Sequence, residues 1–201
     1  THGHTLRERE DPTLQPTTSP PAMQLVCGLW QILLLTVLYC TCTTMSFAIL
    51  PHMFTHWNAS SIFGLFQSFL ALLQLAGSIF MGALIDRWHS KTGFLVSCLA
   101  CCGTFLLASL SPTVLIFFLA HVPSALHQGV LSARSYIALR TSQTERAQAL
   151  AYVGVCWGIG VALGPTIGGI LGGVFSLRGT LFCCSCGSAA LGALGWVLLS
   201  W

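Results

Sequence analysis

Apolar residues fill six long stretches of this chain, and short polar segments separate them. Each stretch is close to the roughly 20 residues that an α-helix needs to cross the hydrocarbon core of a bilayer. The stretches are continuously apolar rather than alternating, which excludes a transmembrane β-barrel. The pattern predicts an all-α membrane protein with six transmembrane helices, over Gln24–Leu50, Ser60–Ile85, Thr92–Leu110, Thr113–Leu139, Ala147–Gly173 and Thr180–Ser200.

The composition indicates that lipid, rather than water, surrounds most of the chain. Hydrophobic residues make up 54% of the 201 residues and charged residues only 6%, whereas about a quarter of the residues in ordinary soluble domains are charged. Residues 1–22 are instead polar and contain several prolines and threonines, so they cannot bury enough apolar area to offset their ordering entropy. We therefore expect a disordered cytoplasmic tail over residues 1–22 and one six-helix bundle over residues 23–201.

The basic residues predict how the bundle is oriented, because membrane proteins concentrate lysine and arginine on the cytoplasmic side. With a cytoplasmic N-terminus, the outer side receives only Arg178. The inner side then receives Arg7, Arg9, Arg87, Lys91, Arg140 and Arg146. We expect both ends to be cytoplasmic in a multi-pass protein of the plasma membrane or an intracellular membrane.

Several other kinds of site are not expected from this sequence. The net charge of +3 includes no basic run, so no nucleic acid is expected as a partner. Most of the ten cysteines lie in apolar stretches, where they behave as small hydrophobes, and we expect no metal and no cofactor. An intramembrane serine protease needs an activated serine, and the sequence G-x-S-G is absent, so we expect no enzyme. Asn58 begins an N-glycosylation sequon on the predicted outer loop, although its closeness to the next helix opposes modification.

Two short segments carry the strongest functional signals. Gly82–Lys91 joins the second and third predicted helices and holds Asp86 and Arg87 in a chain with few charges. The alternative interpretation of this segment is a solvated loop that carries positive charges on the inner side of the membrane. In the fifth predicted helix, glycines recur every four residues, at Gly160, Gly164, Gly168 and Gly172. Such a stripe lets two helix backbones approach closely, as generic membrane packing also requires, and Pro165 removes a backbone hydrogen bond and bends the helix.

These segments resemble two signatures of the major facilitator superfamily. The first is similar to the loop between its second and third helices, which reads glycine, three residues, aspartate, arginine. The second is similar to the antiporter motif of its fifth helix, G-x-x-x-G-P-x-x-G-G. The resemblance covers the chain from about Met23 to Trp201 and implies the N-terminal six-helix half of a twelve-helix transporter. Segments that begin at Ala120, Glu145 and Gly154 most resemble the organic-cation-transporter-like branch.

The resemblance also implies roles for individual residues. Gly82 and Asp86 match residues that pack the second helix against the partner half and latch the cytoplasmic gate, and Arg87 and Lys91 match the accompanying bases. The bend of the fifth helix that packs against the other half matches Gly160, Gly164, Pro165, Gly168 and Gly169. The sequence departs from the family at His89, where the loop signature has a glycine, and on the fourth helix, where the family's arginine is missing.

Polar residues inside the spans are the candidates for binding, because no Asp or Glu lies in any predicted span. On a continuous helix, His121, Gln128 and Ser132 share one face, and His127 and Arg134 share another. We hypothesise that the first face lines a polar cavity in which His121 carries or senses a proton, since imidazole titrates near neutral pH. The alternative is that these side chains only hydrogen-bond between helices. Two further substrate candidates on the second helix are Gln67 and Gln74.

The resemblance implies transport of a small organic solute, such as an organic cation or a drug-like amphiphile, by alternating access, with proton exchange as one option. The chain begins at Thr1 without methionine and ends inside an apolar stretch, so we expect a fragment or a truncated form. Its expected partners are membrane lipid, the solute and a missing C-terminal six-helix half. The alternative is a non-transporting six-span adaptor or truncation product.

Overall fold

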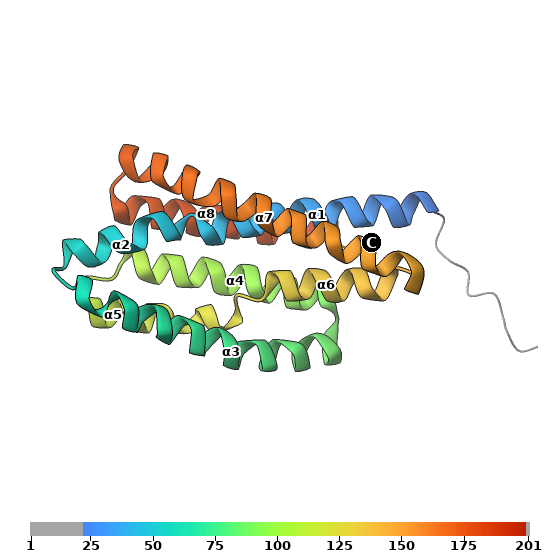
Figure 1. Ribbon diagram of the computed structural model, residues 1–201, viewed down its shortest axis with the longest axis horizontal. Helices are drawn as coiled ribbons and strands as arrows, with labels where there is room; N and C mark the ends of the chain where they lie inside the picture. The colour runs from blue at the N-terminus through green and yellow to red at the C-terminus, as the bar shows by residue number, and fades with distance from the viewer. Residues whose placement is uncertain (1–21, 200–201) are drawn as a thin grey trace, which may run out of the picture.

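The structure is a computed structural model that describes residues 22–199, as a bundle of helices running along one common direction (Figure 1). Residues 1–21 of the tail predicted over residues 1–22 lie outside the described residues, and Ala22 begins the first helix. Six helical segments are long and apolar enough to span a membrane: Gly28–His56, Ser60–Trp88, Ser90–Ser109, Val114–Arg140, Gln143–Val174 and Leu177–Leu198. The predicted all-α fold with six transmembrane helices is confirmed. Helices suit these sequences because a helix satisfies its own backbone hydrogen bonds in hydrocarbon.

The first, second and third spans are built from four α-helices and one short 3₁₀ helix. In chain order they are α1 (Ala22–Thr44), α2 (Ser46–His56), η1 (Ser60–Ile62), α3 (Phe63–Trp88) and α4 (Ser90–Ser109). The first span extends beyond the predicted Leu50, because α2 continues through Pro51 to His56. The loop after the first span is therefore shorter than the sequence predicts, and Asn58 lies exposed in a left-handed conformation (φ 52°) between α2 and η1.

The second half of the chain completes the bundle with α5 (Val114–Ala120), η2 (Val122–Leu126), α6 (Gly129–Arg140), α7 (Gln143–Val174) and α8 (Leu177–Leu198). Helix α7 packs along α1, and α8 packs along α4. Helices α3 and α7 are among the least buried spans. Their exposed side chains include Leu72, Leu75, Ile79, Ile159 and Ile170.

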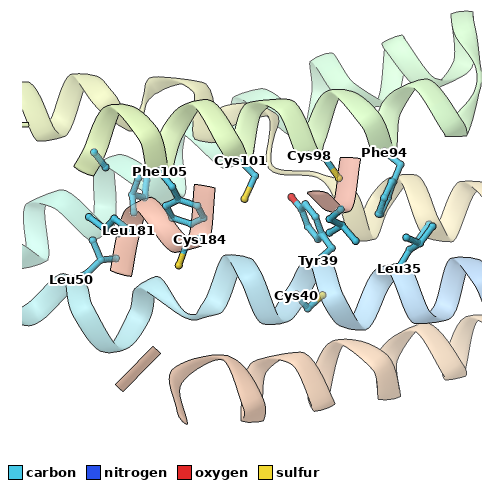
Figure 2. Close-up of a cluster of buried hydrophobic side chains, with 14 of the residues drawn as sticks. Leu35, Tyr39, Cys40, Leu50, Phe94, Cys98, Cys101, Phe105, Leu181 and Cys184 are labelled. Atoms are coloured by element: carbon cyan, nitrogen blue, oxygen red, sulfur yellow. The ribbon is translucent and has the colours of Figure 1, made fainter. Parts of the chain in front are cut away.

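The core draws buried side chains from every α-helix of the bundle, and one part of it lies between α1, α4 and α8 (Figure 2). Figure 2 shows Tyr39 of α1 pointing toward α4, and its ring centroid lies 5.8 Å from that of Phe94. Cysteines fill much of the same space, and the cysteines from Cys40 to Cys186 are free thiols. The Cys101 thiol lies 3.1 Å from the Ser188 hydroxyl. Small polar contacts of this kind join membrane helices without placing a charge in the core.

The fourth span is broken in the middle, which corrects the expectation of one continuous helix over Thr113–Leu139. After α5 the chain forms η2 and then two non-helical residues, His127 and Gln128, before α6 begins (Figure 1). Pro123 lies in the first turn of η2 and has no amide to donate to the preceding turn. The break lies against α3, where a Cβ added to Gly77 would clash with the backbone of Ala125.

Candidate functional site: a cavity at the break in the fourth span

A cavity of about 290 Å³ lies between α1, α2, α3, α7 and the break in the fourth span. Phe47 and Trp157 on its rim are 54% and 52% exposed, so the cavity is open on one side. The described lining residues include no Asp, Glu, Lys or Arg. They include Tyr39, Cys40, Thr43, Thr44, Leu70, Gln74, Phe105, His121, Ser124, His127, Val130 and Val161. The volume is near the lower end of the roughly 300–1,000 Å³ typical of small-molecule sites.

His121 lies on the cavity, as the sequence predicts, but an aromatic cluster fixes its ring. The His121 Nδ1 atom lies 2.9 Å from the Phe117 carbonyl oxygen, and this nitrogen must carry the proton to donate. The ring packs edge-on against Phe66, with 4.9 Å between centroids, and lies 4.5 Å from the ring of Phe117. The remaining nitrogen, Nε2, is then a hydrogen-bond acceptor.

His127 also lies on the cavity, which corrects its predicted placement on a different face from His121. The face assignment assumed 100° per residue across the whole span. Because His127 and Gln128 have non-helical backbone angles, that periodicity is lost between the two histidines. Both imidazole rings therefore line the same cavity, whereas Arg134 is exposed.

The other polar candidates divide between the cavity and the helix packing around it. Gln74 lines the cavity, and its carbonyl oxygen accepts a hydrogen bond of 3.0 Å from Gln128 Nε2, which ties the break to α3. Ser132 is fully buried and donates to the Gln128 carbonyl oxygen at 3.2 Å, so it stabilises the start of α6. Gln67 is exposed on α3 and does not line this cavity. Of the predicted candidates, the cavity lining contains His121 and Gln74. It does not contain Gln128, Ser132 or Gln67.

Three polar atoms on the cavity are buried without a hydrogen-bond partner among the described residues. They are the Tyr39 hydroxyl, the Ser124 hydroxyl and His127 Nε2. The Tyr39 hydroxyl lies near the Gly129 amide without meeting the geometry of a hydrogen bond. Ser124 could not be predicted from the sequence, because a lone serine in an apolar helix carries no signal of its own. Pro123 was the available signal, since it marks the break that places Ser124 on the cavity.

The glycine stripe of α7 packs against α1, inside this half of the fold. A Cβ added to Gly160, Gly164 or Gly168 would clash with Cys40, Thr44 or Met45 respectively. The Thr44 hydroxyl lies 2.7 Å from the Cys40 carbonyl oxygen of α1 and 2.9 Å from the Gly160 carbonyl oxygen of α7, so its one proton is shared between the two helices. The expectation that the stripe needs a partner outside this chain is therefore wrong for these three glycines.

The remaining residues of the α7 motif have a different environment. Nothing lies within 4 Å of the Cβ positions of Gly169 and Gly172. Pro165 is half-buried inside the continuous helix α7. The packing of the stripe on α1 therefore stops after Gly168, because Gly172, the next glycine of the stripe, meets open space. Gly169 lies on another face of α7, which is also open.

The Gly82–Lys91 segment forms the tight connection between α3 and α4. Asp86 and Arg87 are exposed at the end of α3, and nothing lies within 4 Å of the Cβ position of Gly82. His89, which replaces the family's glycine, has φ 147° and ψ 150°, a conformation that favours glycine. Lys91 lies over the Trp196 ring, 4.8 Å from its centroid. His89 therefore holds, at the single residue between α3 and α4, a backbone conformation that glycine adopts more readily.

Comparison with known proteins places the chain in a family. The model of the Major Facilitator Superfamily matches residues 32–200. Solute carrier family 22 member 18 of Mus musculus is 34% identical over 150 residues, which cover 72% of this chain and 37% of that protein. Solute carrier family 67 member A1 of Homo sapiens is 31% identical over 144 residues, 69% of this chain and 34% of that protein.

A bacterial relative matches more weakly. Tetracycline resistance protein, class C, of Escherichia coli is 27% identical over 118 residues, 58% of this chain and 30% of that protein. The chain spans little more than a third of the length of the curated relatives first described, and no solved structure gives a significant match. The six apolar helices, both motifs and the matched model agree that the chain belongs to the Major Facilitator Superfamily.

Proposed function

We propose that this chain forms one wall of a pathway that carries a small organic solute across a membrane by alternating access. The observation that carries the proposal is the charge-free cavity at the break in the fourth span, which is open on one side. Transporters of this kind bind solute near the bilayer midplane, between two halves that rock against each other. The cavity of this chain is the corresponding half-site.

The exposed faces of α3 and α7 support the proposal that a second wall of the solute pathway packs opposite the cavity. Both helices line the cavity and also carry large exposed apolar side chains, including Leu75 and Ile159. Gly82 and Gly169 add positions where a neighbouring helix can approach closely, because the space at their Cβ positions is empty. A further six-helix half is the proposed partner on these faces, and Asp86 would latch the two halves at the cytoplasmic end.

The class of solute is proposed from the names of the relatives and from the cavity lining. Two relatives are solute carriers and another is a tetracycline resistance protein, so the proposed solute is an organic cation or a drug-like amphiphile. Phe47, Phe105 and Trp157 offer apolar and aromatic walls for such a molecule. Exchange for protons would use His121 or His127, since the described lining has no carboxylate.

Vesicle flux tests this proposal. The full chain, in its longest natural form, is reconstituted into liposomes with a fluorescent organic cation, ethidium, with and without a pH gradient. Protein-dependent flux of ethidium that unlabelled tetraphenylphosphonium inhibits is the expected result. Correctly inserted protein that moves neither compound would contradict the proposed solute class. Equal flux by a His121→Asn variant at every pH would remove His121 as the proton carrier.

A further inference from the structure

The cavity at the break is lined by residues whose buried hydrogen-bonding groups have no partner among the described residues. Tyr39 and Ser124 are each 3% exposed, both line the cavity, and neither hydroxyl has a partner among the described residues. His127 Nε2 is a third buried atom without a hydrogen-bond partner among the described residues, although the His127 ring also lies near the backbone of Ala100. Buried polar groups are nearly always hydrogen-bonded in native proteins, so three orphans on one cavity indicate that something else occupies it.

The start of α6 also has unused hydrogen-bonding groups beside this cavity. Gln128 precedes α6 and makes no side-chain hydrogen bond that caps the helix. The amide of Ser132 is the first one in α6 that donates to a carbonyl oxygen of the preceding turn, that of Gln128. The first amides of a helix have no acceptor within the helix, and they favour an electronegative group at that end. Val130 of this first turn lines the cavity. The 12-residue α6 therefore begins beside the unpartnered hydroxyls.

We propose that this break binds an uncharged polar group of the solute, a hydroxyl or an amide, through Tyr39, Ser124 and His127. The proposal rests on the proposed function and names the chemistry that this wall recognises. Each hydroxyl can donate and accept, and so can a hydroxyl or amide of the solute. A full charge is disfavoured at this wall, because the described lining offers no opposite charge and burying an unpaired ion is costly.

The apolar part of the same solute has a defined place beside the polar group. Phe105 and Leu70 lie on the inner part of the cavity, and Phe47 and Trp157 lie on its exposed rim. An aromatic or aliphatic body can pack on these walls while its polar group reaches the break. The wall thus selects amphipathic molecules by a neutral polar group, and any charge of the solute lies outside this pocket.

Binding of two matched probes tests the proposal. Equilibrium binding of tritiated 2-naphthol and 2-methylnaphthalene is measured on the full chain in lipid nanodiscs, with empty nanodiscs subtracted. The probes share one ring system and differ in the hydroxyl. Ser124→Ala and Tyr39→Phe are each expected to weaken 2-naphthol binding about threefold to tenfold, which is the loss of one net hydrogen bond. Binding of 2-methylnaphthalene should be unchanged, whereas a folding defect would weaken both probes.

A matched control and a stability readout complete the test. Ser111→Ala removes a buried hydroxyl that is already bonded to the Leu107 carbonyl oxygen and does not line the cavity, so it should leave both affinities unchanged. Ser124→Ala should not lower the thermal stability of the ligand-free protein, because it removes an unpaired buried group. If the Ser124 hydroxyl had a purely structural role, Ser124→Ala would instead lower the thermal stability of the protein.

Each outcome separates the inference from the proposed function. Unchanged 2-naphthol binding in both Ser124→Ala and Tyr39→Phe would overturn the inference and leave buried water as the partner of these groups. Tighter binding of 2-naphthoate than of 2-naphthol would overturn the preference for an uncharged group. Hydroxyl-dependent binding without ethidium flux would contradict the proposed transport but uphold the inference.

Discussion

The turn between α3 and α4 provides a sharp test of the structural account, because one residue there has an unfavourable backbone conformation. His89 has φ 147° and ψ 150°, and its side chain is exposed. Holding a residue with a Cβ in this region costs about 1–3 kcal/mol. Glycine has no Cβ and adopts the conformation freely, although its extra freedom in the unfolded chain costs about 0.5–1 kcal/mol. His89→Gly is therefore predicted to stabilise the protein by about 1 kcal/mol.

The assay is thermal unfolding of the full chain in one detergent, followed by circular dichroism at fixed protein concentration. For a chain of this size, 1 kcal/mol corresponds to a rise in Tm of about 2–4 °C. His89→Ala is the matched control, because it removes the imidazole but keeps the Cβ that causes the strain. Only His89→Gly should raise Tm. A His89→Gly protein that melts at or below the temperature of His89→Ala would refute the strain argument.

Two further predictions concern the packing of α7 against α1. Gly164→Ala should destabilise the protein by about 1–3 kcal/mol, because the added methyl would clash with Thr44. Gly172→Ala adds its methyl to open space and should leave Tm unchanged. Equal shifts of Tm for the two variants would refute this packing. Thr44→Val keeps the shape of the side chain but removes the hydroxyl that lies between the Cys40 and Gly160 carbonyl oxygens. It should cost about 0.5–1.5 kcal/mol, as measured by the same melting assay, and a neutral result would show that this hydroxyl does not stabilise the protein.

The sequence was sufficient to predict the six spans, because hydrocarbon selects long apolar helices whatever their contacts. Within a span the sequence is less informative, as the fourth span shows. Its residues are apolar on both sides of Pro123. Hydropathy alone therefore predicts one continuous helix and gives no sign of the break at His127 and Gln128. The assignment of His121 and His127 to separate faces failed for that reason alone.

The glycine stripe shows a different limit. Spacing of four residues predicts a close helix contact, and the structure has one at Gly160, Gly164 and Gly168. Spacing does not say which helix supplies the contact, because a smooth surface fits many partners. In the structure α1 fills this place, with Thr44 hydrogen-bonded to the α7 backbone. The partner is set by the arrangement of the whole bundle, which no local pattern contains.

The measurement that tests the central claim most directly is solute flux with the cavity filled. Val161 lines the cavity, whereas Val155 on the same helix is 59% exposed and does not line it. Val161→Trp and Val155→Trp are compared for ethidium flux in liposomes at matched amounts of inserted protein. Val161→Trp is expected to abolish flux, because its side chain would fill the cavity, whereas Val155→Trp should retain it. Equal flux by the two variants would contradict the claim that this cavity is one wall of the pathway.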